Sequence, residues 1–230
     1  MKVIRINIRG VFGESIVSAA VGNGNKLQLH VFDFDDTIVN TGDSSLRVKV
    51  IHTPDDGVEP TVTYLSSREY ASKKLPTSGK VELDFSDFDT VPSDIELKPH
   101  FEKMKQAMKN SNSYVMILTA RSDAQPVVEF LKNLPNEIFP DELGVPDVVG
   151  VGNSDPSFKS SYIKNLILDK GFGEVYFYDD AIKNVEAVAS LSNDLDDVKI
   201  DVEQVEESYE YLVNQYDSRS ISRNFFKKYN

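Results

Sequence analysis

The chain of 230 residues contains no cysteine, and this absence excludes disulfide bonds and thiolate chemistry and fits a reducing compartment. No segment approaches the run of roughly 18 apolar residues that a membrane-spanning helix needs. The first ten residues, MKVIRINIRG, interrupt their apolar positions with Arg5, Asn7 and Arg9. They therefore lack the continuous apolar core of a signal peptide. We expect a cytoplasmic protein that does not associate with membranes.

Positive charge is also scarce, because 25 lysines and arginines stand against 37 aspartates and glutamates, for a formal net charge of −12. A field of that sign repels polyanions, so long duplex nucleic acid is not an expected partner. Residues 217–230 depart from this pattern, since they mix basic residues with Phe225 and Phe226. Two interpretations of this tail stay open: contact with a single-stranded nucleic acid, or a terminal segment docked on the acidic body.

What is present indicates an α/β fold. With 40% hydrophobic and 27% charged residues, the composition is that of a globular protein large enough for one sizeable domain with a small insert. Apolar periodicity predicts helices and strands that alternate after residue 98. The predicted helices cover 99–109, 124–133, 156–170, 181–191 and 202–214, and the predicted strands cover 114–118, 145–151, 174–178 and 198–201. Such alternation favours a doubly wound parallel sheet.

A different pattern occupies residues 43–97. Segments 46–50 and 61–65 alternate on either side of a Pro-Asp-Asp-Gly turn, which predicts a β-hairpin, and 80–85 is a further strand candidate. We therefore expect 43–97 to form a flap hairpin and a small β-rich cap insert. Residues 1–42 and 98–230 would form the α/β core, with an edge strand at 3–8 added to the core sheet or to the insert.

The most informative stretch is Asp33-Phe34-Asp35-Asp36-Thr37, which follows the apolar run 27–32. In an extended exit from a strand, Asp33 and Asp35 point the same way while Phe34 points back toward the core. Charges near a core are heavily penalised unless they are paired or bound to a metal. Two carboxylates at a strand end form a hard-oxygen site suited to Mg²⁺. The alternative is that the acidic residues only open a turn.

Three later segments end or begin with residues of the same chemistry. The apolar run 113–118 leads into Thr119-Ala120-Arg121, and the run 175–178 leads into Asp179-Asp180. The helix predicted to begin at Pro156 carries Lys159 in its first turn. Ligands of open α/β sheets bind outside the carboxyl ends of the strands, so we expect these segments to meet at one edge.

These residues resemble the motifs of the haloacid dehalogenase (HAD) superfamily of phosphotransferases, in family order and over residues 28 to 184. The matches are Asp33, Asp35 and Thr37 in the first motif, Thr119 in the second, Lys159 in the third, and Asp179 and Asp180 in the fourth. The resemblance implies a Rossmann-like core with a cap. Thr119-Ala120-Arg121 is also loosely similar to the Ser/Thr-x-Arg signature of polynucleotide 3′-phosphatase domains.

On this resemblance, Asp33 is the nucleophile that forms an aspartyl-phosphate, and Asp35 is the general acid and then the base. Mg²⁺ would be bound by Asp33, the backbone carbonyl of Asp35, and a carboxylate of Asp179 or Asp180, with Asp180 preferred as the direct ligand.

Four further residues complete the predicted site. Lys159 would neutralise charge between nucleophile and phosphate, and the Thr119 hydroxyl would donate to a phosphate oxygen. Thr37 either orients the motif loop toward the substrate or only fixes the turn. Arg121 either reaches a substrate phosphate or pairs with a carboxylate.

Lys159 is preferred to Lys164 on geometry, because a helix that returns from the carboxyl edge has its first turn beside the site. Lys164 lies five residues further on, which is about 7.5 Å along the axis and roughly 140° around it. The alternative for Lys159 is a solvated helix lysine.

The sequence thus predicts a Mg²⁺-dependent phosphomonoester hydrolase. Its substrate would be a small phosphate ester, a nucleotide or a 3′-phosphate end, and its oligomeric state stays open. The alternative is a catalytically silent HAD-like binding module that acts through the insert or the basic tail. A dehalogenase is disfavoured, because Asp35 is a proton-transfer residue of the kind that phosphoryl transfer needs.

Overall fold

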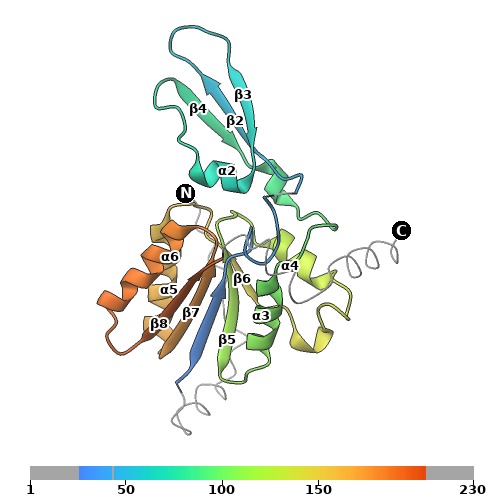
Figure 1. The fold of residues 1–230 in the computed structure, drawn as a ribbon, viewed down its shortest axis with the longest axis vertical. Coiled ribbons are helices and arrows are strands. Elements are labelled where there is room, and N and C mark those ends of the chain that lie inside the picture. Colours follow the sequence, from blue (N-terminus) through green and yellow to red (C-terminus); the bar gives the residue numbers. More distant parts are fainter. Residues whose placement is uncertain (1–25, 43, 206–230) are drawn as a thin grey trace, which may run out of the picture.

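The computed structural model describes residues 26–42 and 44–205. A five-stranded parallel sheet carries helices on both faces, and a separate three-stranded antiparallel sheet lies beyond the carboxyl ends of its strands (Figure 1). The strand order of the large sheet is β6-β5-β1-β7-β8, with β1 Gln28–Phe32, β5 Ser113–Thr119, β6 Asp147–Gly150, β7 Glu174–Asp179 and β8 Lys199–Gln204. Within the described part of the chain, no helix is long and apolar enough to cross a membrane.

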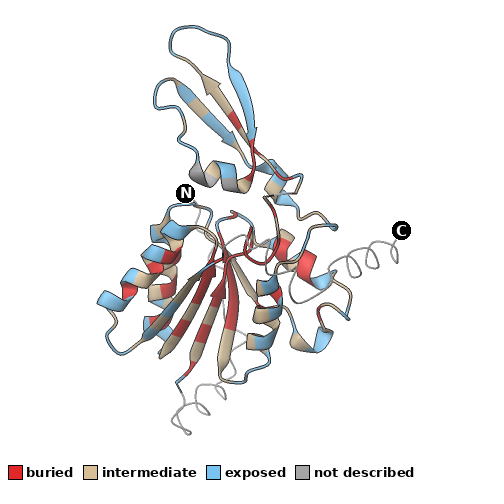
Figure 2. Cartoon of the chain, viewed as in Figure 1, coloured by how far each residue is buried: buried red, intermediate tan, exposed pale blue. Residues whose placement is uncertain are grey.

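The central strands are apolar on both faces, which is why helices cover both sides of the sheet. On β1, Leu29 and Val31 point to one face and Phe32 points to the other. The first face packs against α5 (Pro156–Lys170) and α6 (Ile182–Ala189), and the second packs against α3 (Pro99–Met108) and α4 (Gln125–Lys132). Buried positions accordingly concentrate in the middle of the large sheet (Figure 2).

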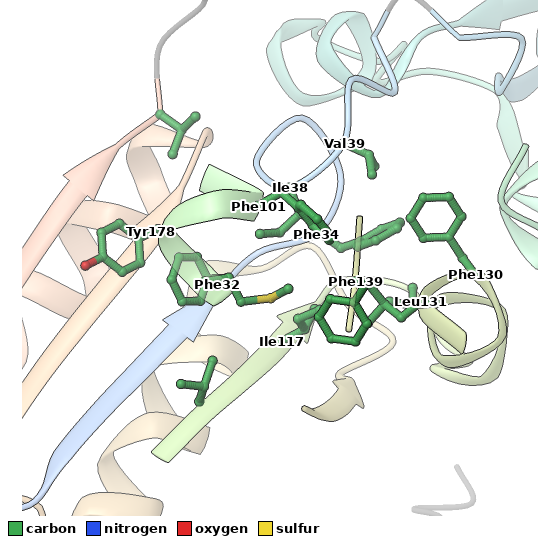
Figure 3. Close-up of a cluster of buried hydrophobic side chains, with 14 residues drawn as sticks. Phe32, Phe34, Ile38, Val39, Phe101, Ile117, Phe130, Leu131, Phe139 and Tyr178 are labelled. Atoms are coloured by element: carbon green, nitrogen blue, oxygen red, sulfur yellow. The ribbon is translucent and has the colours of Figure 1, made fainter. Parts of the chain in front are cut away.

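The core on the α3 and α4 side continues up to the site edge. Phe32, Phe34 and Ile38 are fully buried there, and the Phe34 ring meets the ring of Phe130 edge to face at 5.9 Å. Figure 3 shows this cluster, in which Phe34 lies among side chains from α3, α4 and the loop after β1. The expectation that Phe34 turns back into apolar surroundings is therefore confirmed. Its burial fixes the loop that carries the neighbouring carboxylates.

The helix that follows β6 has clear start and stop signals. Asp155 caps its first turn by accepting a hydrogen bond from the Ser157 backbone, and Pro156 occupies the first helical position. Gly171 ends it in the left-handed conformation, with φ of 71°, which glycine adopts without steric cost. The helix predicted over 156–170 is thus confirmed at both ends, so Lys159 starts from a well-defined turn.

The insert forms the second sheet, with strand order β3-β2-β4 and bounds β2 Val48–Thr53, β3 Thr61–Leu65 and β4 Lys80–Asp84. The predicted hairpin is confirmed, since Val50 lies opposite Thr63 in an antiparallel pair. One face of this sheet packs Val48, Val50 and Leu65 against a small apolar cluster. The sheet is therefore a small structure with its own core.

Two elements differ from the predictions. A short helix, α2 Ser67–Ser72, is not among the predicted elements of the insert, and Ser66 and Glu69 form a capping box at its start. That pair is a sequence signal for a helix N-terminus.

The helix predicted from residue 202 is wrong at its start, because residues 199–204 form β8 beside β7. Ile200 and Val202 alternate with polar residues, which is the period of a strand, and pairing with β7 continues that alternation. The predicted strand at 3–8, the remainder of the predicted last helix from 206, and the basic tail lie outside the described residues.

Candidate active site

Three carboxylates converge at the carboxyl edge of the large sheet. Because β1 and β7 pair in parallel with Phe32 opposite Tyr178, the acidic residues that follow them, Asp33 and Asp179, become neighbours. The Asp33 backbone N–H donates to the Tyr178 carbonyl at 2.8 Å and extends this ladder. Oxygen atoms of Asp33, Asp179 and Asp180 all lie within 4.8 Å of one another. A pair of adjacent parallel strands is enough to build this group.

Lys159 lies inside this carboxylate group. Its Nζ is 2.7 Å from Asp33 Oδ1 and 2.7 Å from Asp179 Oδ2, and its side chain is only 3% exposed. Lys164 is directed elsewhere, since its Nζ pairs with Asp194 on the surface at 2.6 Å. The structure therefore brings the first-turn lysine of α5 to the carboxylates and leaves the later lysine outside.

The charges in the group do not balance, because three carboxylates, two of them buried and that of Asp180 partly buried, face one ammonium. Burial raises the pKa of Asp33 well above its ordinary range, and the Lys159 charge offsets only part of that effect. Burial also raises the pKa of Asp180 to about 7, and the neighbouring Asp179 adds to the shift. Burial alone would lower the pKa of Lys159, but Asp179 and Asp33 reverse this and raise it. A buried excess of hard oxygen charge is the donor set that suits a divalent cation.

Asp179 is the most firmly held of the three carboxylates. It is fully buried, and its oxygens accept hydrogen bonds from Lys159, from the Ala181 backbone at 2.9 Å and from Asn184 Nδ2 at 3.0 Å to each oxygen. Asn184 comes from the first turn of α6, where it serves to orient Asp179. With these oxygens already occupied by protein donors, Asp33 and Asp180 are the better candidates for direct metal ligands.

Asp35 belongs to a second, separate ion pair with Arg121, which follows β5. Arg121 Nε donates to Asp35 Oδ2 at 2.9 Å and Nη2 donates to Asp35 Oδ1 at 2.7 Å. The third nitrogen, Nη1, donates to the backbone carbonyls of Phe88 at 2.7 Å and Thr90 at 3.0 Å. Of the two interpretations that the sequence left open for Arg121, the structure has the pairing with a carboxylate. All three guanidinium nitrogens donate to protein atoms.

The two threonines of the predicted site are buried and bind protein groups. Thr119, at the end of β5, accepts a hydrogen bond from the Arg121 backbone at 3.3 Å, and its hydroxyl lies 3.5 Å from Asp35 Oδ2. Thr37 Oγ1 accepts from the Asp180 backbone N–H at 3.1 Å. Thr37 thus ties the first motif loop to the loop after β7, which is a positioning role rather than a substrate contact.

Asp36 forms a turn and attaches the loop after β1 to the insert. Its φ is 57°, a left-handed value that aspartate tolerates better than most residues. Its side chain accepts hydrogen bonds from Ser67 Oγ at 2.6 Å and from the Gly42 backbone at 2.6 Å, and Lys98 Nζ donates to its carbonyl oxygen. Nothing in the sequence predicted the contact with Ser67, because α2 itself was not predicted.

Comparisons of the chain with protein-family models, with curated proteins and with solved structures found no match.

Proposed function

We propose that this protein is a Mg²⁺-dependent phosphomonoester hydrolase of the HAD type, which works through an aspartyl-phosphate on Asp33. The observation that carries the proposal is the buried group in which Lys159 Nζ lies 2.7 Å from both Asp33 and Asp179, with Asp180 alongside. A structural ion pair needs one carboxylate for each cation. A surplus of buried carboxylates at the ligand-binding edge of a parallel sheet has its simplest explanation in a bound cation.

The donor set fits magnesium. Asp33 and Asp180, with the backbone carbonyl of Asp35, would hold the ion, since Mg²⁺ prefers carboxylate and carbonyl oxygens and binds through few protein ligands. The bound ion would supply positive charge to a phosphoryl oxygen during transfer. Asp179 would position Lys159, because it shares that ammonium with Asp33.

The chain's own residues then divide the reaction into two displacements. Asp33 attacks phosphorus, the bond from phosphorus to the ester oxygen breaks, and Asp35 gives a proton to the departing oxygen. In the second step Asp35 takes a proton from water, water attacks phosphorus, and the acyl-phosphate bond to Asp33 breaks to release inorganic phosphate. Lys159 stabilises charge between Asp33 and the phosphoryl group, and Thr119 donates its hydroxyl to a phosphoryl oxygen.

The substrate class proposed is a small phosphate ester, a nucleotide or a 3′-phosphate end. The support is the net charge of −12, which disfavours long duplex tracking but not the approach of a single phosphate group.

The decisive experiment is hydrolysis of an aryl phosphate by the full chain, with Mg²⁺ or with a chelator. Wild type is compared with Asp33→Asn and with the matched surface variant Asp194→Asn. We expect metal-dependent turnover that Asp33→Asn loses and Asp194→Asn keeps. Acid quenching and borohydride reduction of the wild type during turnover should convert residue 33 alone to the alcohol, as detected by mass spectrometry.

A folded wild-type protein that neither binds Mg²⁺ nor hydrolyses any member of a panel of aryl, sugar, nucleotide and 3′-phosphorylated oligonucleotide substrates would overturn the proposal. Magnesium binding with no turnover on this panel would instead favour a catalytically silent binding module.

A further inference from the structure

Arg121 joins two parts of the chain that are far apart in sequence. On one side its Nε and Nη2 hold both oxygens of Asp35, at 2.9 and 2.7 Å. On the other side its Nη1 holds the carbonyl oxygens of Phe88 and Thr90, at 2.7 and 3.0 Å, in the segment that leads out of the insert. One buried guanidinium therefore contacts both the insert and the loop after β1, residues 33–42, which is called the motif loop below.

The guanidinium is fixed in this place by its surroundings. Its central carbon lies 5.3 Å from the ring centroid of Phe34 and 5.4 Å from that of Phe88, so one ring of the core and one ring of the insert contact it. The Arg121 side chain is 4% exposed. A buried charged donor that loses its acceptors is strongly penalised, so the two carbonyl oxygens of the insert hold Nη1 in place.

A second attachment joins the insert to the same loop. Ser67 Oγ, at the start of α2, donates to Asp36 Oδ2 at 2.6 Å and lies 3.3 Å from Thr41 Oγ1. The motif loop is thus bonded to the insert directly through Asp36 and indirectly through Arg121 and Asp35. Within the described residues, the side chains of Asp33 and Asp179 instead bond to Lys159, Ala181 and Asn184, which all belong to the core.

We propose that Arg121 is a positioning residue that orients the carboxylate of the acid/base group Asp35. Because Arg121 also binds the insert, Asp35 is correctly oriented only when residues 85–90 of the insert are packed against Arg121. This inference depends on the proposed function, because it assigns Asp35 its proton-transfer role. The pairing fixes the plane of the Asp35 carboxylate and leaves one lone pair on each oxygen for a proton. If the insert moves away, Nη1 loses both acceptors and the guanidinium loses one ring, so Asp35 loses its fixed orientation.

The test compares two substrates that differ in how much their leaving groups need a proton. A nitrophenolate leaves readily as an anion, whereas an alkoxide requires a general acid. The value of kcat/KM reports the steps up to transfer of the phosphoryl group to Asp33. General acid catalysis contributes roughly 10²–10⁴-fold, so we expect Arg121→Ala to lower kcat/KM at least ten times more for an alkyl phosphate than for nitrophenyl phosphate. Inhibition by inorganic phosphate should be unchanged.

Variants of the insert test the link itself. Phe88→Leu keeps apolar volume in the insert but removes the ring that contacts the guanidinium, and it should shift substrate selectivity in the same direction as Arg121→Ala, by less. Val62→Ala, on the exposed strand β3 of the same sheet, is the matched control and should leave selectivity at the wild-type value. Amide hydrogen exchange over residues 85–97 should rise in Arg121→Ala, while exchange in β1 and β7 stays unchanged.

Once circular dichroism has shown that each variant is folded, the results distinguish a positioning role of Arg121 from a role in binding the substrate phosphate. Equal losses on both substrates together with weaker phosphate inhibition would make Arg121 a substrate-phosphate ligand and overturn the inference. Equal losses with unchanged phosphate inhibition, or unchanged exchange over 85–97, would also overturn it. A wild-type protein that hydrolyses neither substrate contradicts the proposed function instead, and the exchange experiment still shows whether Arg121 holds the insert.

Discussion

Two cation–carboxylate groups lie side by side at the edge of the large sheet, and they are built differently. The Lys159 group takes both of its carboxylates from the ends of paired strands, and its members are almost fully buried. The Arg121 group has one carboxylate, Asp35, whose side chain is 17% exposed, and two backbone carbonyls from the insert. The register of the sheet and the first turn of α5 set the first group within the core, whereas the second forms only where the core and the insert meet.

The difference in charge is equally instructive. Arg121 and Asp35 are matched one to one, so their pair is electrically complete. Around Lys159 the carboxylates outnumber the cation, and the pKa values of Asp33 and Asp180 are raised as a result of burial and mutual repulsion. This contrast is the reason that we propose a bound cation for the Lys159 group and a positioning role for Arg121.

Among variants that test the difference between the two groups, Lys159→Met should cause the largest loss in the free energy of unfolding. Removing one partner of a buried ion pair typically costs about 3–5 kcal/mol, and here two carboxylates would be left facing each other without their cation. Urea unfolding at pH 8 in chelator measures the loss. The matched control Lys164→Met removes an exposed pair with Asp194, which should cost at most about 1 kcal/mol. Similar losses in the two variants would contradict the contrast.

The second prediction, with an effect of intermediate size, concerns how the surplus carboxylate Asp180 makes stability depend on pH. Burial and Asp179 raise the pKa of Asp180 to about 7, so the folded state binds a proton that the unfolded state has already released. The metal-free protein should therefore lose stability as pH rises toward 7, the direction that linkage requires when the native state binds more protons. If magnesium binds as proposed, it takes the place of that proton, and its stabilising effect should be larger at pH 8 than at pH 6.

Thermal melts with and without Mg²⁺ at both pH values measure this difference. At a concentration of Mg²⁺ about 100 times its Kd, the stabilisation is about 2.7 kcal/mol. Asp180→Asn should reduce both the pH dependence and the response to the ion. If the variant keeps the full response to Mg²⁺, Asp180 is not a ligand.

The smallest expected effect is a difference in stability between two variants of Asp36, the residue that binds the insert through Ser67. Asp36 has φ of 57° and bonds to Ser67 and to the Gly42 backbone. Asp36→Gly and Asp36→Ala lose the same side-chain hydrogen bonds, but only alanine is strained at a left-handed φ, which costs roughly 1–2 kcal/mol. We expect the glycine variant to unfold at higher urea than the alanine variant. Equal midpoints would mean that the turn relaxes to another conformation.

The sequence predicted the parts of the site that depend on regular structure. Strand ends could be located from apolar runs, and parallel pairing places the residues that follow those ends at one edge. The position of Lys159 followed from helix geometry, since its helix begins at the same edge. Strand ends and the start of this helix depend on short stretches of sequence. Apolar runs and capping residues are therefore enough to predict them.

The attachment of the insert could not be predicted in the same way. The acceptors for Arg121 are backbone carbonyls of Phe88 and Thr90, and a carbonyl leaves no signature in the residue type. The contact of Asp36 with Ser67 spans 31 positions and depends on how two folded parts meet. By contrast, α2 and β8 carry local sequence signals, a capping box for α2 and an alternation of apolar and polar residues for β8.

The order of strands also has a consequence for how the chain folds. β1 pairs with β5 and β7, so that Gln28 lies opposite both Ser113 and Glu174, and the Lys159 contact with Asp33 spans 126 positions. The strands of the insert, between β1 and β5 in the chain, pair over short separations, which form faster than distant ones. We expect the insert to fold first and thereby shorten the loop that must close before β1 meets β5. During synthesis, the charged cluster would then assemble last, after β7 has emerged.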